Sequence, residues 1–134
     1  MLLRNITLLS FAALTFLSAC QDGEESNMAE IARMQDTVLK LYANTSQVTV
    51  GVKYHTDLSV VVWDDKLYNG TDQERQQRAN EVGNLALTVF GKDNKLEKGR
   101  FAVVKSTEKN AVPDESVEKG CNINIDSLKK ANGK

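Results

Sequence analysis

The run Leu58-Ser59-Val60-Val61-Val62-Trp63 is apolar at every position except Ser59. A strand this continuously apolar is typical of the centre of a sheet, where both faces are buried. The segment before it alternates instead, with small or polar residues between its apolar positions, which are Val48, Val50, Val52 and Tyr54. That period of two predicts a strand with one buried face. Because His55-Thr56-Asp57 is short enough for a hairpin loop, we expect the two strands to pair with each other.

A helical pattern precedes this hairpin. Apolar residues recur there at spacings of three and four, namely at Ile31, Met34, Val38, Leu41 and Tyr42. This spacing places them on one face of a helix. We expect Ser26 or Asn27 to cap its start, and Asn44-Thr45-Ser46 supplies a polar stop.

A second helix is predicted after the hairpin. Thr71-Asp72-Gln73-Glu74 matches a capping box, in which the first and last side chains bond to each other's backbone N–H groups. The apolar stripe that follows consists of Ala79, Val82, Gly83, Ala86, Val89 and Phe90. Its small members predict a close approach to the sheet, and Gly91 is well placed to end the helix.

Two further strands are predicted in the rest of the chain. They cover residues 100–105 and 121–125, and Asp126-Ser127-Leu128 is expected to open one last helical turn before a basic tail. Residues 107–120 form a long polar loop that contains the only proline, Pro113. Loops of this length within small domains are usually functional or disordered.

The predicted element order is α-β-β-α-β-β, in a single α+β domain over residues 28–134. Two helices with one apolar side each and four short strands favour a two-layer sandwich. Sequential hairpins predict a small, mainly antiparallel sheet, although the helical crossover leaves a parallel pairing of the second and third strands open. The order of the strands within the sheet is not determined by the pattern.

The amino-terminal segment carries a separate signal. Leu17-Ser18-Ala19-Cys20 closes a short apolar run that follows Arg4, and it resembles the lipobox of bacterial lipoproteins. The resemblance implies that residues 1–19 are a cleaved signal peptide and that the Cys20 sulfur and the new amino terminus carry lipid. Plain secretion and a retained anchor are the alternatives. The twelve residues 6–17 are too few for a membrane span, which takes about 20.

The residues after Cys20 add to this expectation. In the Gram-negative lipoproteins that the segment resembles, an aspartate after the cysteine favours the inner membrane, and Gln21 stands there instead. The resemblance therefore implies the periplasmic side of an outer membrane, if the host has one. We expect residues 20–27 to form the lipidated cysteine and a short polar tether. Several acyl chains would make this a stable membrane anchor.

The charge balance argues against nucleic acid as a partner. Arg4 is the only charged residue among the first 19, so the mature chain keeps 16 basic and 18 acidic side chains. The basic residues are scattered and do not form the patch that is typical of a phosphate-binding surface.

Few residues are candidates for catalysis. His55 is the only histidine, and it lies close to Asp57 and Ser59 in the chain. A triad is defined by geometry, however, and a hairpin directs these three side chains to different faces. The other candidates are the carboxylates of Asp64, Asp65 and Asp72. They lack the ligand spacing of a calcium loop, so we expect no catalytic site, metal or cofactor.

Cys121 is expected to be structural. It shares a predicted strand face with Ile123 and Ile125, which favours a small buried side chain. If Cys20 is lipidated, the chain offers Cys121 no disulfide partner, so a free thiol and an intermolecular disulfide both remain open.

Aromatic residues are the better candidates for binding. Trp63 ends a predicted strand and Tyr68 follows it, and both residue types are enriched at interfaces. The alternative for Trp63 is that it caps the core. An extended Val112-Pro113 segment is expected either to dock on a partner or to serve as a connection. The sequence thus predicts a lipid-anchored envelope protein that binds another envelope protein without enzymatic activity. The alternative is a membrane-tethered domain that binds a small ligand or inhibits an enzyme.

Overall fold

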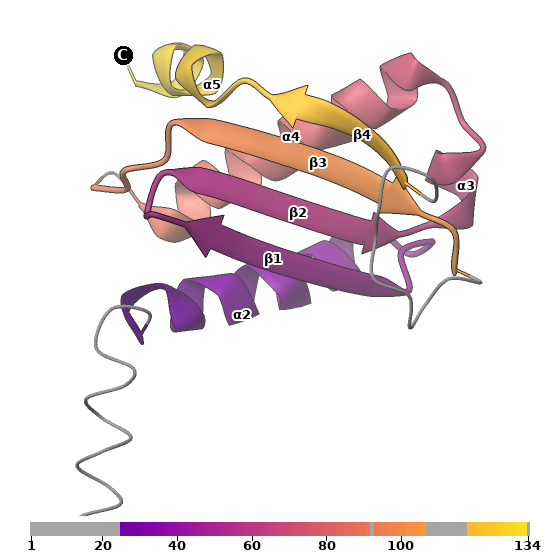
Figure 1. The fold of residues 1–134 in the computed structure, drawn as a ribbon, viewed down its shortest axis with the longest axis horizontal. Coiled ribbons are helices and arrows are strands. Elements are labelled where there is room, and N and C mark those ends of the chain that lie inside the picture. The colour runs from indigo at the N-terminus through magenta and orange to yellow at the C-terminus, as the bar shows by residue number, and fades with distance from the viewer. Residues whose placement is uncertain (1–24, 92, 107–117, 134) are drawn as a thin grey trace, which may run out of the picture.

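A mixed four-stranded sheet forms one layer of the protein (Figure 1). The computed structural model describes residues 25–91, 93–106 and 118–133. The strands lie side by side in chain order and are β1 (Gln47–Lys53), β2 (Asp57–Trp63), β3 (Lys98–Val104) and β4 (Glu118–Ile123). The α+β class and the pairing of the first two strands are confirmed.

The prediction of a mainly antiparallel sheet is wrong. β1 pairs with β2 and β3 pairs with β4 in antiparallel fashion, but the central pair β2 and β3 is parallel. In the sequence, a long helix connects β2 to β3 and returns the chain along the sheet. Both strands therefore start at the same end of the sheet. Such a crossover is what a parallel pair requires.

Four helices accompany the sheet, namely α2 (Glu25–Leu41), α3 (Asp65–Tyr68), α4 (Asp72–Phe90) and α5 (Ile125–Asn132). The predicted order α-β-β-α-β-β therefore lacks α3 and underestimates α5, which continues through most of the expected tail. A helix of one turn is too short to show a periodic pattern, so α3 has no such signal.

Several bounds also differ. α2 already begins at Glu25, so neither Ser26 nor Asn27 precedes it as the expected cap. β3 begins at Lys98 and β4 begins at Glu118. β4 ends at Ile123, so Ile125, which was expected on the same strand face as Cys121, is instead the first residue of α5.

The core lies between the sheet and the two long helices. α2 packs on β1, α4 packs on β3 and β4, and the two helices contact each other. The side chains that fill this space are fully or almost fully buried and include Met34, Val38, Val60, Val62, Ala79, Val82, Ala86, Phe101 and Val103. Leu41 departs from the expected stripe, because it is the last residue of α2 and is 61% exposed. β2 is less enclosed than predicted, since Ser59 is exposed and Val61 is only partly buried.

The turn between β1 and β2 has an unusual backbone. Tyr54 and His55 have φ angles of 57° and 63°, and the backbone N–H of Thr56 donates to the carbonyl of Lys53 at 3.1 Å. Two consecutive positive φ angles are what a type I′ turn requires, and asparagine and glycine are the residues that favour it. Tyr54 therefore belongs to the turn and not to the apolar face of β1, where the alternation had placed it.

Gly83 lets α4 approach the sheet closely, as its small residues predicted. A Cβ atom at this position would lie 2.5 Å from both Ile123 Cγ2 and Leu128 Cδ1. These two side chains belong to β4 and α5, so three elements meet at one backbone position.

We expect Gly83→Ala to lower the free energy of unfolding by up to about 2 kcal/mol. The overpacking penalty of about 1–3 kcal/mol opposes a helix-propensity gain of about 1 kcal/mol. Urea unfolding followed by circular dichroism measures the difference. Gly51→Ala is the matched control, because a Cβ there meets no atom within 4 Å. A stabilised Gly83→Ala protein would contradict the close packing.

Candidate partner-binding surface

Asp64 is buried and occupies the N-cap of α3. Its side chain is 1% exposed. One carboxylate oxygen accepts the backbone N–H of Leu67 at 2.9 Å, and the other accepts the Thr45 hydroxyl at 2.9 Å. The second oxygen also lies 3.6 Å from Nη1 of Arg78 in α4. Because its two oxygens bind groups from three segments, Asp64 connects α3, α4 and the residues just before β1.

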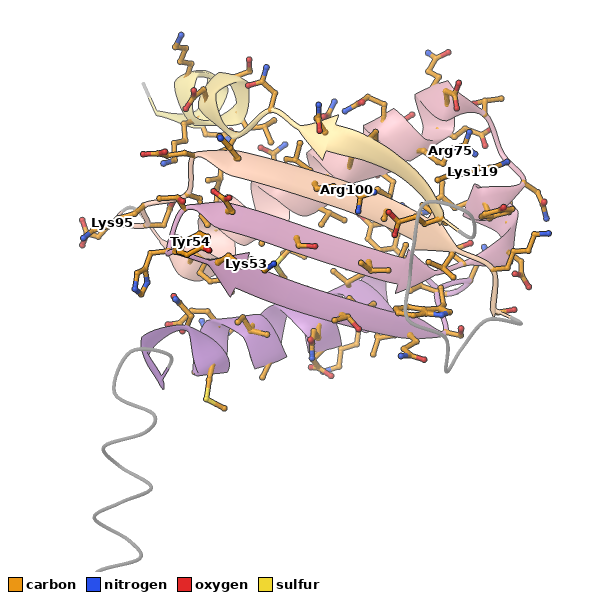
Figure 2. The ribbon with its side chains drawn as sticks, in the orientation of Figure 1. Lys53, Tyr54, Arg75, Lys95, Arg100 and Lys119 are labelled. Atoms are coloured by element: carbon orange, nitrogen blue, oxygen red, sulfur yellow. The ribbon has the colours of Figure 1, made fainter. Side chains whose placement is uncertain are left out.

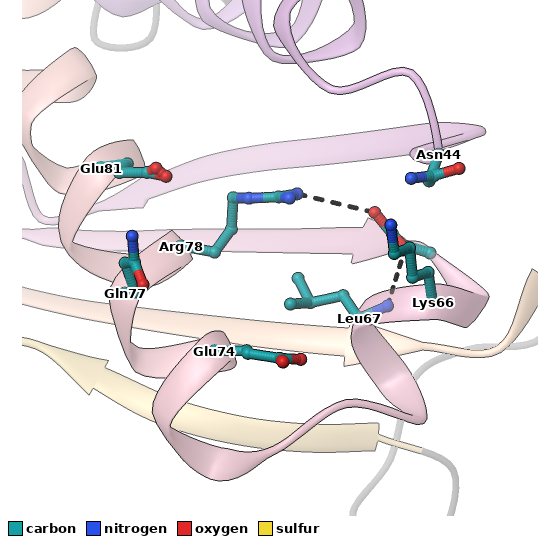
Figure 3. A pocket seen from close by; sticks show the side chains of 8 residues that line it. Asn44, Lys66, Leu67, Glu74, Gln77, Arg78 and Glu81 are labelled. Atoms are coloured by element: carbon teal, nitrogen blue, oxygen red, sulfur yellow. Dashed lines mark hydrogen bonds and ion pairs between the residues drawn. The ribbon is translucent and has the colours of Figure 1, made fainter.

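Arg78 crosses from α4 toward α3 along a polar cleft (Figure 3). Its guanidinium stacks on the Tyr42 ring, 3.7 Å from the ring centroid. Burial and the nearby Glu81 carboxylate raise the pKa of Tyr42, and the Arg78 charge partly opposes this. The cleft has a volume of about 270 Å³, and its lining consists of Asn44, Asp64, Lys66, Leu67, Glu74, Gln77, Arg78 and Glu81.

Asp65 has different partners from its neighbour Asp64. It is exposed, and its carboxylate accepts the Ser106 backbone N–H at 2.8 Å and the Ser106 hydroxyl at 2.5 Å. These hydrogen bonds hold the pKa of Asp65 below its usual value, with a smaller contribution from the Lys105 charge. Asp72, the third carboxylate considered, pairs with Arg75 instead. Within the described ranges there is no group of three or more residues that could hold a metal ion.

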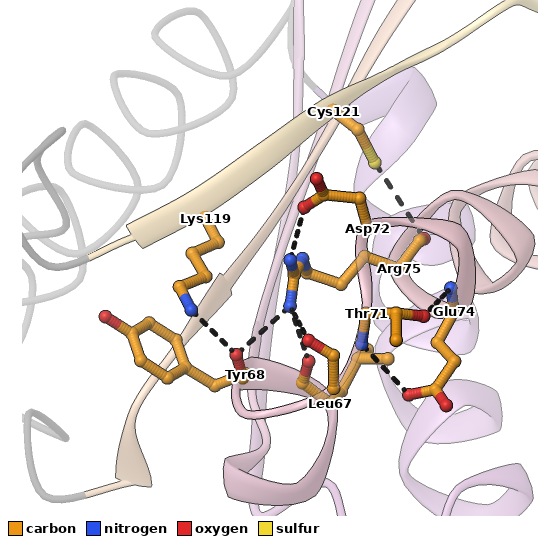
Figure 4. A network of polar contacts seen from close by, with 9 residues as sticks. Leu67, Tyr68, Thr71, Asp72, Glu74, Arg75, Lys119 and Cys121 are labelled. Carbon is orange, nitrogen blue, oxygen red and sulfur yellow. Dashed lines mark hydrogen bonds and ion pairs between the residues drawn. The ribbon is translucent and has the colours of Figure 1, made fainter.

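Arg75 closes the carboxyl end of α3 (Figure 4). It is 8% exposed, and its Nη1 donates to the carbonyls of Leu67, Tyr68 and Gly70 at 3.1, 3.1 and 2.8 Å. Carbonyls at the end of a helix lack partners within the helix, so this arginine satisfies them. The sequence pattern gave no signal for this role, because the bonded groups belong to the backbone.

Tyr68 lies beside two lysines that come from distant parts of the chain. The ammonium groups of Lys105 and Lys119 are 5.2 and 4.4 Å from its ring centroid. Lys119 also donates to the Tyr68 carbonyl at 3.2 Å. Together with the contact between Asp65 and Ser106, these bonds bring Tyr68 and its neighbours into one patch. We call Asp65, Tyr68, Lys105, Ser106 and Lys119 the α3 surface.

The other aromatic candidate is less accessible. Trp63 is 3% exposed, so Tyr68, which is partly buried, is the one of the two that a partner can reach. Val112 and Pro113, like Cys20 and Gln21, lie outside the described residues. Lys105 and Lys119 flank the segment that contains Val112 and Pro113.

The remaining chemical candidates do not come together. His55 contacts the Asn27 side-chain nitrogen at 3.4 Å, Asp57 accepts the Thr56 hydroxyl at 2.8 Å, and Ser59 is exposed on β2. Cys121 is a partly buried free thiol whose Sγ lies 3.8 Å from the Arg75 carbonyl. Burial raises the pKa of Cys121, against the smaller effect of Arg75 and Arg100. A thiol with a raised pKa is a poor nucleophile at neutral pH.

Comparison with known proteins finds no family, no curated protein and no solved structure that matches this chain. Among the described residues, no helix has the length and apolar character needed to cross a bilayer. The geometry of the α3 surface is therefore the basis for a functional proposal.

We expect Asp64→Ala to lower the free energy of unfolding by about 3 kcal/mol. The change removes a helix cap and leaves Arg78 without its buried counter-charge. Denaturant unfolding measures the effect. Asp36→Ala is the control, since Asp36 pairs with Lys40 at 2.9 Å on the exposed side of α2 and should change stability by less than about 0.5 kcal/mol. Equal losses in the two variants would contradict the joining role of Asp64.

The contact between Asp65 and Ser106 should persist in mild acid. Because the folded-state pKa lies below the usual value of 3.8, the contact is complete above that pH and is lost as the pH falls through the lowered pKa. The Ser106 amide resonance, followed by NMR from pH 7 to pH 2, should titrate with a midpoint below 3.8. Asp65→Asn should abolish the titration. A midpoint at or above the usual value would show that the contact is not formed in solution.

Proposed function

We propose that the protein is a lipid-anchored bacterial envelope protein that binds another envelope protein and has no enzymatic activity. The resemblance of Leu17-Ser18-Ala19-Cys20 to a lipobox supports the anchor at Cys20, and Gln21 supports the periplasmic side of the outer membrane. The observation that carries the binding role is the α3 surface, where an aromatic ring and two lysines are held in place by side-chain and backbone contacts.

The rigidity of this surface favours protein recognition. An aromatic side chain that is already fixed loses little conformational entropy on binding, and tyrosine is among the residues that dominate binding energy at interfaces. Arg75 fixes the backbone beneath Tyr68, and Lys119 binds the same carbonyl from the sheet side. The lysines provide charge complementarity to a partner with an acidic patch.

The α3 surface also lies far from the proposed anchor. α3 is at the opposite end of the sheet from the start of α2 (Figure 1), and the proposed tether directly precedes α2 in the sequence. α2 has 17 residues, which corresponds to about 25 Å at 1.5 Å per residue. A partner in the periplasmic space can therefore approach the α3 surface without obstruction by the membrane.

A variant that carries Tyr68→Ala and Lys105→Ser should lose partner capture by about tenfold or more, since a central aromatic residue and a charge are removed together. The measurement is affinity capture of the tagged protein from mildly crosslinked envelopes, with quantitative mass spectrometry. The matched control combines Leu41→Ala with Lys40→Ser, which removes an exposed apolar residue and a lysine from α2. Capture by the Tyr68 variant at the wild-type level would contradict the proposed surface.

The cleft beside Arg78 favours a second candidate function. Its volume of about 270 Å³ and its mixed charges suit a small polar ligand, as in a ligand-binding or inhibitory domain. The two functions differ in their need for the anchor. A soluble Cys20→Ala protein should remain active as a ligand-binding or inhibitory domain, whereas a module that positions an envelope partner should lose its activity in the cell.

A further inference from the structure

Outside the α3 surface, the turn between β1 and β2 has the most unusual backbone conformation of the described residues. Tyr54 is 85% exposed and Met28, near the start of α2, is 54% exposed. Both line one open cavity of about 560 Å³, together with Ile31, Val52, Lys53 and His55. We define the turn end as Met28, Lys53, Tyr54 and His55.

The conformation of Tyr54 is costly and the core does not explain it. A left-handed backbone costs a non-glycine residue about 1–2 kcal/mol, and the turn places two such residues in succession. A largely exposed ring recovers little of this cost through burial. Strained backbone that is retained without a packing reason is typical of functional positions.

The turn end lies on the side of the domain where α2 begins. In Figure 2, Tyr54, Lys53 and Lys95 occupy the end of the sheet next to the start of α2, whereas Arg75 and Lys119 lie at the other end. Only five residue steps separate Cys20 from Glu25, the first residue of α2. At about 3.5 Å per residue, that length allows at most about 18 Å between a lipidated cysteine and the domain.

Part of that length is used within the membrane surface. The headgroup layer of one leaflet is about 5–8 Å thick, so the first turn of α2 is held within roughly 10–13 Å of the headgroups. A domain tied this closely has one end facing the lipid. The exposed residues at that end include Tyr54 and Met28, and tyrosine is enriched at membrane interfaces.

We propose that the turn end rests on the phospholipid headgroups, with Tyr54 and Met28 inserted among them, which directs the α3 surface away from the bilayer. This inference rests on the lipid anchor of the proposed function. The contact depends on the aromatic and apolar side chains more than on charge. Lys95 and Lys98 alternate there with Asp93 and Glu97, so the contact should form on zwitterionic as well as anionic lipid.

Tryptophan fluorescence tests the contact in the acylated protein. Tyr54→Trp is made in a Trp63→Phe background and reconstituted into phosphatidylcholine vesicles with acyl-chain-brominated lipid, with and without phosphatidylglycerol. We expect bromine to quench this tryptophan at least about twofold in both mixtures, as for an interfacial aromatic residue. Leu41→Trp in the same background is the matched control, because Leu41 is exposed at the far end of α2, and it should not be quenched.

Hydroxyl-radical footprinting of the unmutated acylated protein supplies an independent measurement. Met28 and Tyr54 should react at least about twofold more slowly on vesicles than in the soluble Cys20→Ala protein, while Leu41 should not change. Mass spectrometry of the amino-terminal peptide separates the two proposals. An unlipidated Cys20 would overturn the anchor and the contact together. A lipidated Cys20 with no quenching at position 54 and no protection of Met28 or Tyr54 would overturn the contact alone.

Discussion

The buried residue Asp64 joins four other parts of the chain, three through its carboxylate and one through its backbone. It binds Thr45 before β1, the backbone of Leu67 in α3 and the guanidinium of Arg78 in α4. The Asp64 backbone N–H also donates to the Val104 carbonyl at the end of β3, at 3.1 Å. A buried charge must keep its partners, because losing one of them is strongly destabilising. This end of the sheet is therefore held as a unit, and the α3 surface is built on it.

Features that depend on neighbouring residues could be predicted from the sequence. The alternation before Lys53 and the apolar run of β2 predicted their pairing, and both hydrogen bonds of the capping box between Thr71 and Glu74 are present. The parallel pairing of β2 with β3 could not be predicted, because it depends on where α4 returns the chain. α3 was missed because its single turn is too short to show a helical period, although its capping bond from Leu67 to Asp64 spans only three residues.

In the candidate site, too, features set by neighbouring residues could be predicted and features set by distant residues could not. Tyr68 was identified from its residue type and its place after a strand, but Lys119, which lies 51 residues away, could be found only from the fold. Trp63 was selected by the same reasoning and is almost fully buried. The sequence places both aromatics near a strand end, whereas the packing around that end decides which of them reaches the surface.

The parallel pairing at the centre of the sheet also has a kinetic consequence. In each of the two antiparallel pairs, β1 with β2 and β3 with β4, a single connection separates the strands in the sequence. β2 and β3 are instead separated by both α3 and α4. Closing so long a loop costs entropy before any contact compensates for it. The hairpins are therefore expected to form first and the central pair last. Until then β2 and β3 each present an unpaired edge to other chains, so docking of α4 sets how long a newly made chain is prone to aggregate.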